Sequence, residues 1–177
     1  MKRAKIYFQT TPFEGLIKSA YETLRVECQG SLFGRRNPKT LEWFIESILP
    51  SQLVDRKPDG VYFINKLAAT REEAELIKEK IGEYHSHTMF RKDHAKKVCM
   101  SKFDAEMLKQ RKDEIEIIIG VKKAKITTLP NNPFLATCYI RNKGNLYRFD
   151  IGGYHYSGKL RRAEIIVPEK VIREFGV

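Results

Sequence analysis

A chain of 177 residues can bury one hydrophobic core but is short for two, so we expect a single domain spanning residues 1–177. Hydrophobic residues make up 42% of the chain without a run of the roughly 18 to 20 that a membrane span needs, which excludes a membrane protein of that kind. Lys and Arg number 33 against 22 Asp and Glu, and the net charge of +11 favours a phosphate group or an acidic partner surface.

The first half of the chain reads as alternating helices and strands. Apolar residues at spacings of three and four predict helices over residues 12–24, 40–49 and 71–80. Short apolar runs bounded by turn residues predict strands over residues 26–33 and 61–65.

The second half is predicted to contain mostly strands. Residues 83–87 (EYHSH) should be extended after Gly82. Ser101 followed by Asp104 resembles a capping box, which predicts a helix running toward Asp113. Apolar and alternating runs then predict strands over residues 115–119, 138–140, 146–150 and 163–167, with turns at residues 142–145 and at Gly152-Gly153.

This order of elements indicates the fold class. Helices are expected mainly in the first two thirds of the chain, whereas strands dominate the last third. The pattern is typical of an α+β fold, in which a mixed, largely antiparallel β-sheet is flanked by helices.

Two histidines two residues apart suggest a metal site. His85 and His87 lie on a predicted strand, so their side chains point to the same face. Catalytic zinc typically keeps three protein ligands and a water, and two His with a carboxylate form a common ligand set. We expect Asp104, in the first turn of the next helix, to be the third ligand.

The segment before this helix contains other possible ligands. Zinc accepts nitrogen, oxygen and sulfur donors, so Asp93, His94 or Cys99 could take the place of Asp104.

The motifs GEYHSH and SKFD (residues 101–104) together resemble the signature of the JAMM (MPN-plus) zinc metalloproteases, an HxH pair followed by SxxD. Residues 26–34 (VECQGSLFG) resemble the first core strand of that family, which carries a glutamate. The resemblance spans about residues 13–119. Two features depart from it: Thr88 stands where the family usually has proline, and six extra residues lie before Met100.

The resemblance implies a JAMM/cytidine-deaminase-like architecture with a Zn2+ ion held by His85, His87 and Asp104. It also implies that Glu27 deprotonates the water bound to zinc, which has a pKa lowered toward about 7. Ser101 would help to hold the oxyanion, although a helix N-cap requires the same residue type.

The implied activity is that of an isopeptidase or peptidase that cuts near the C-terminal tail of a ubiquitin-like or sulfur-carrier-like protein. A metal-free MPN-type scaffold is an alternative, because the spacing after His87 is altered. A nucleic-acid-associated protein is another, motivated by the net charge of +11. The basic residues are scattered along the chain, which makes this last alternative weaker.

The cysteines indicate a cellular location. Cys28, Cys99 and Cys138 are odd in number and widely spaced, which argues against a disulfide framework. The first residues, MKRAKIYFQ, lack the apolar stretch of a secretory signal. We therefore expect reduced thiols in a cytoplasmic protein.

Overall fold

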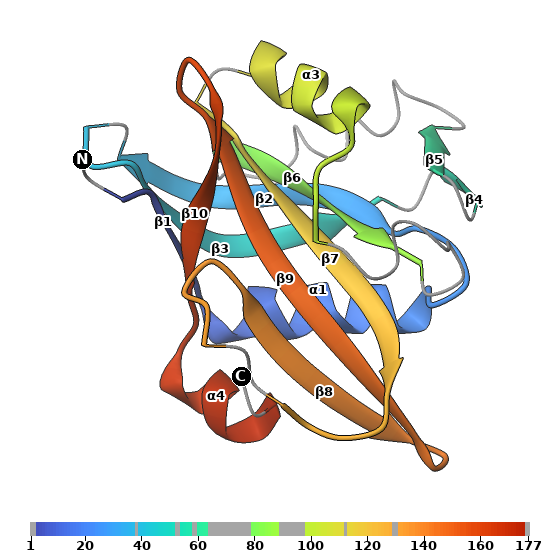
Figure 1. Cartoon of the computed structure of the whole chain (residues 1–177). Coiled ribbons are helices and arrows are strands. Elements are labelled where there is room, and N and C mark those ends of the chain that lie inside the picture. Colours follow the sequence, from blue (N-terminus) through green and yellow to red (C-terminus); the bar gives the residue numbers. More distant parts are fainter. Residues whose placement is uncertain are drawn as a thin grey trace.

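The computed structural model describes residues 3–37, 39–51, 54–57, 60–63, 79–88, 98–111, 113–128 and 131–175. The strands in these ranges are β1 (Lys5–Phe8), β2 (Gln29–Asn37), β3 (Glu42–Pro50), β4 (Val54–Lys57), β5 (Gly60–Phe63), β6 (Glu79–His87), β7 (Ile115–Ala124), β8 (Ala136–Asn142), β9 (Asn145–Tyr156) and β10 (Leu160–Ile166). The helices are α1 (Thr10–Glu22), α3 (Lys102–Gln110) and α4 (Glu169–Phe175) (Figure 1). None of the described helices is both long and apolar enough to cross a membrane.

Seven strands form a closed barrel. They follow the order β10-β1-β3-β2-β6-β7-β9, and β9 pairs again with β10 to complete the ring. β8 pairs with β9 outside the ring, and β4 and β5 form a separate two-stranded sheet. The barrel is mixed, because β1 runs parallel to both β10 and β3, and β6 runs parallel to β7.

The expected α+β architecture, an open mixed sheet flanked by helices as in a JAMM/cytidine-deaminase-like fold, is therefore wrong. One cause lies in residues 40–49, which were expected to be helical and instead form most of β3. Trp43 and Ile45 alternate with less buried neighbours there, and β3 pairs with β1 on one side and β2 on the other. Backbone pairing on both edges outweighs a helical spacing of apolar residues.

The Gly152-Gly153 pair, expected as a turn, lies inside β9. A Cβ atom on Gly152 would come within 2.5 Å of Val98, and one on Gly153 within 2.5 Å of Ile6. These glycines therefore allow two layers of side chains to approach the strand closely from opposite sides.

Several other expected helices and strands are present in the described residues. The helix near the N-terminus is confirmed as α1, the SxxD helix as α3, and the later strands as β7 to β10. Most of the helix expected over 71–80 lies outside the described residues, although Glu79 and Lys80 belong to β6. The strand expected over 61–65 is confirmed where it overlaps β5. β1 and α4 were not predicted.

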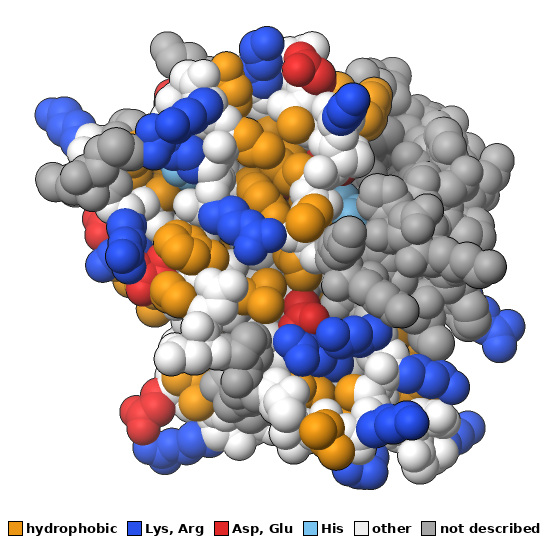
Figure 2. Space-filling view, viewed as in Figure 1, with side chains coloured by type: hydrophobic (Ala, Val, Ile, Leu, Met, Phe, Trp, Pro, Cys, Tyr) orange, Lys and Arg blue, Asp and Glu red, His pale blue; other side chains and the backbone are white. Residues whose placement is uncertain are grey.

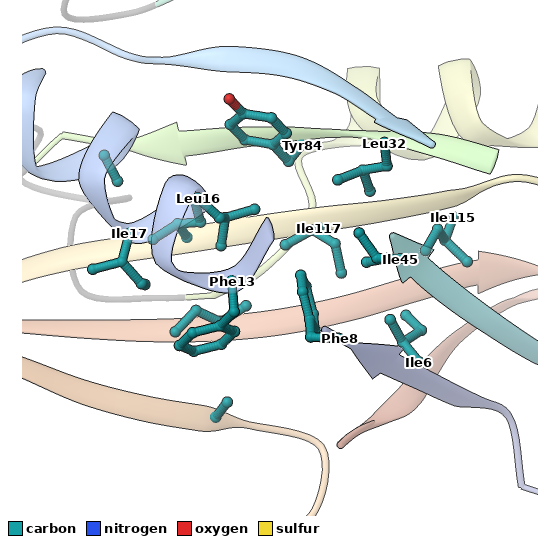
Figure 3. Close-up of a cluster of buried hydrophobic side chains, with 14 of the residues drawn as sticks. Ile6, Phe8, Phe13, Leu16, Ile17, Leu32, Ile45, Tyr84, Ile115 and Ile117 are labelled. Carbon is teal, nitrogen blue, oxygen red and sulfur yellow. The ribbon is translucent and has the colours of Figure 1, made fainter. Parts of the chain in front are cut away.

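The main core fills the inner face of the barrel. We define the inner face by the side chains that join one buried cluster (Figure 3). Helix α1 contributes Phe13, Leu16 and Ile17 to it, and Ile45 and Ile117 belong to β3 and β7. The apolar face predicted from the helical spacing in α1 is thus the face that packs against the strands.

A smaller cluster lies on the opposite, outer face. Leu108 of α3 packs there with Ile118 of β7, Tyr154 of β9 and Val98. The Tyr154 hydroxyl donates a hydrogen bond to the carbonyl oxygen of Val98. This cluster fixes α3 against the outer face of the barrel, beside β6.

Candidate metal centre

Strand alternation places both predicted histidines on the outer face. Tyr84 belongs to the inner core, so His85 and His87, which alternate with it, project outward. His87 is only 3% exposed. The prediction that these two side chains share one face of a strand is confirmed.

The register between β2 and β6 places Glu27 on the same face. Gln29 lies opposite His85, and the Ser86 backbone N–H donates to the carbonyl of Cys28 at 2.8 Å. Continuing this antiparallel pairing by one residue puts Glu27 opposite His87, and directly opposed residues project to the same side of a sheet. Glu27 is buried, at 6% exposed.

A capping box begins α3 and positions Asp104. The backbone N–H of Asp104 donates to the Ser101 hydroxyl oxygen at 3.1 Å, and the backbone N–H of Ser101 donates to Oδ2 of Asp104 at 2.9 Å. This reciprocal pair satisfies two donors that a helix start leaves open. It also turns the carboxylate back toward β6.

The donor atoms of His85, His87 and Asp104 meet in one group. Nε2 of His85 lies 3.3 Å from Nε2 of His87 and 3.7 Å from Oδ2 of Asp104. All three ligand atoms lie within 4.8 Å of one another. Two imidazole nitrogens and one carboxylate oxygen gathered at this spacing could hold a metal ion.

Two residues that the sequence did not reveal hold His85 in place. Nδ1 of His85 lies 2.9 Å from Oε1 of Glu116 on β7, and Nη2 of Arg111 donates to the other carboxylate oxygen at 2.6 Å. A carboxylate at Nδ1 favours the tautomer that leaves Nε2 available to a metal. Arg111 also pairs with Glu83. The signal in the sequence was a single charged residue within the apolar run IEIII.

Acidic side chains surround His85 and determine the electrostatics of the group. Burial alone would lower the pKa of His85, but the hydrogen bond and charge of Glu116, with the charges of Asp104 and Glu27, outweigh it and raise the pKa. Burial alone would raise the pKa of Asp104, yet His85 and the hydrogen bonds from Ser101 leave it lowered. The imidazole ring of His85 and the carboxylates around it therefore form a site that favours a positive charge.

The alternative ligands are placed differently. Asp93 and His94 lie outside the described residues. Cys99 is exposed, and its sulfur lies 3.9 Å from Nη2 of Arg162. Within the described part of the chain, the group that could hold a metal contains His85, His87 and Asp104. Ser101 serves as the N-cap of α3, and its oxyanion role stays a prediction.

Comparisons with known proteins bear on the fold. No protein-family model matches the chain, and no curated protein matches it. The chain is similar to the solution structure of protein DSY2949 from Desulfitobacterium hafniense, with a TM-score of 0.56 and 18% identity over 93% of each chain. A likeness at this identity concerns the fold alone. Fold and site together define a closed mixed barrel with a His-His-Asp group on its outer face.

Proposed function

We propose that this protein is a zinc-dependent hydrolase that cleaves an amide bond. The observation that carries the proposal is the convergence of His85, His87 and Asp104, with all ligand atoms within 4.8 Å, beside a buried Glu27. Two neutral imidazoles and one carboxylate are a common ligand set of hydrolytic zinc, and the three donors leave a fourth position for water or substrate.

Each residue has a distinct task in this proposal. When bound, zinc would supply Lewis acidity toward the amide carbonyl and the attacking water. Glu27 would accept a proton from that water and return it to the leaving amine, as a general base that becomes a general acid. Glu116 would orient His85, and the hydrogen bonds of the capping box would orient Asp104.

The substrate class follows from the resemblance of the local motifs. An HxH pair, an SxxD helix and an upstream glutamate strand are similar to those of JAMM metalloproteases, which favours an isopeptide or peptide bond near the C-terminal tail of a ubiquitin-like or sulfur-carrier-like protein. Because the chain folds as a closed barrel and not as the expected JAMM-like sheet, this proposal rests on the residues of the local site alone. The three free cysteines support action in the cytoplasm.

A Glu27→Gln variant tests the proposal. The zinc-loaded protein should release the tail of a ubiquitin-like fusion, and the variant should be about 10²- to 10⁴-fold slower because it lacks the base. Its zinc affinity, from titration against a chelating dye, should stay within a few-fold of the wild type. Glu22→Gln on the exposed side of α1 removes the same charge and should leave both quantities unchanged. Equal rates for wild type and Glu27→Gln would refute the assigned role.

A metal-free scaffold or binding protein is the second candidate. It is favoured by the internal contacts of the site, because Asp104 already accepts from Ser101 and the Nε2 atoms of His85 and His87 already lie 3.3 Å apart. The same zinc titration separates the two candidates: stoichiometric binding supports the hydrolase, and no binding supports the scaffold.

A further inference from the structure

The outer face that carries the candidate metal centre extends onto β7, β9 and β8. In the strand register His87 lies beside Gly120, Gly120 beside Asp150, and Asp150 beside Thr137. The Thr137 hydroxyl donates to Oδ1 of Asp150 at 2.6 Å. The row that contains His87 therefore continues across three neighbouring strands.

The next row on the same face is basic. Lys122 and Arg148 lie opposite each other, two residues beyond Gly120 and Asp150 in the antiparallel pairing. Side chains two residues apart in a strand share a face, so both project on the side of His87. Lys122 lies about 7 Å along β7 and about 5 Å across from His87, given the dimensions of a sheet.

The charge of this row is only partly balanced. Nε of Arg148 lies 2.7 Å from Oδ1 of Asp150, and Nζ of Lys122 lies 3.8 Å from Oδ2 of the same carboxylate. One carboxylate cannot neutralise two cations. Arg141, on the same outer face of β8, is exposed and adds a further positive charge.

All charged side chains in the segment between Glu116 and Asp150 are basic. No Asp or Glu occurs between Ile117 and Phe149, whereas the segment contains six basic residues: Lys122, Lys123, Lys125, Arg141, Lys143 and Arg148. Figure 2 shows Lys and Arg side chains gathered at the lower right, where Figure 1 places the ends of β7, β8 and β9. We call the outer-face group of Lys122, Arg141 and Arg148 the basic surface; Lys123 lies opposite Tyr147, whose side chain points inward.

We propose that the basic surface binds acidic side chains of an extended polypeptide substrate, two to four residues from the amide bond at the metal centre. This inference rests on the proposed function. An extended chain advances about 3.3 Å per residue, so a substrate cleaved beside His87 reaches Lys122 within that interval. Opposite charges across the contact would raise the rate of association and set the register of the substrate.

The aromatic residues favour an acidic polypeptide over a nucleic acid. Tyr147 and Phe149 of β9 point inward, where their rings contact Tyr21 of α1 at centroid distances of 5.9 and 6.4 Å. Tyr139 lies on the outer face, and its hydroxyl is bound to the backbone of Thr128. In the described strands, the basic surface therefore has charge without a series of rings on which bases could stack.

Fluorescence anisotropy with two labelled peptides tests the proposal. One is a short Gly/Ser peptide with Glu at several positions, and the other carries Gln at the same positions. Zinc-loaded wild-type protein should bind the Glu peptide about tenfold more tightly at about 50 mM salt, and the difference should vanish near 0.5 M, where charges are screened within about 4 Å. The Lys122→Gln/Arg141→Gln double variant should lose most of the preference.

A control double variant has the same net charge as the test variant. Lys18→Gln/Arg35→Gln also removes one Lys and one Arg, but from exposed positions on α1 and β2. It should retain the preference for the Glu peptide. Equal losses in both double variants would overturn the proposal, as would a single-stranded oligonucleotide that displaces the peptide and binds more tightly.

A separate zinc titration distinguishes this proposal from the proposed function. Zinc binding without any peptide preference would overturn the basic surface and leave the hydrolase standing. A peptide preference without zinc binding would overturn the hydrolase while supporting an acidic ligand at this surface.

Discussion

The two faces of β6 have opposite chemistry. Tyr84 projects inward into the apolar core, whereas His85 and His87 project outward among carboxylates. The same alternation in β7 sends Ile117 inward and Glu116 outward. Because successive side chains of a strand alternate, neighbouring strands can support the core on one face and present a polar site on the other.

Two histidines show how strongly the faces differ. Burial and the charge of Arg161 lower the pKa of His155, which is 2% exposed and lies against the ring of Trp43 at 5.4 Å. The acidic neighbours of His85 instead raise its pKa. The inner face therefore favours a neutral imidazole and the outer face a charged one.

The largest expected effect comes from the inner face. Ile117→Ala leaves a cavity in the core and should lower the free energy of unfolding by about 2 to 5 kcal/mol in urea denaturation. Met107→Ala, on the exposed side of α3, serves as the control and should change it by less than about 0.5 kcal/mol. Similar losses for both variants would contradict the assignment of the core to the inner face.

A substitution on the outer face of β7 should instead change the affinity for zinc. Glu116→Gln keeps the shape of the side chain but weakens its hold on His85, so zinc affinity should fall about 10- to 100-fold. Glu83→Gln provides the matched control, because Glu83 contacts Arg111 without an observed contact to His85. If both variants bind zinc equally well, Glu116 is not a positioning residue.

The smallest effect is a pair of opposite titration shifts. In NMR titrations of metal-free protein, His85 should titrate above its usual pKa of about 6.5 and His155 below it. A raised pKa stabilises the fold below about pH 6.5, and this contribution disappears as the pH rises through the folded value. The lowered pKa of His155 costs stability as the pH falls from about 6.5 toward its folded value. Glu116→Gln should shift His85 downward and leave His155 unchanged.

Local signals in the sequence were sufficient to group His85, His87 and Asp104. The HxH alternation and the capping box of Ser101 and Asp104 each span a few residues, so their geometry follows from one strand or one helix start. Glu116 was missed because its relation to His85 depends on the parallel register of β6 and β7, which no short pattern reveals.

Closure of the barrel was missed for a similar reason. It depends on pairing between β1 and β10, which joins Ile6 to Ile165 across almost the whole chain. The β3 segment shows a related limit, since its apolar residues suit a helix equally well until β1 and β2 pair with it on both sides.

The position of β1 has a consequence for how the molecule is made. This strand lies between β3 and β10, so its second edge stays unpaired until residues as late as Ile166 have left the ribosome. Contacts that join distant parts of a chain form slowly, because the intervening loop must first close. We therefore expect the ring to close late in folding, with the nascent protein passing through an open sheet that chaperones can recognise by its bare strand edges.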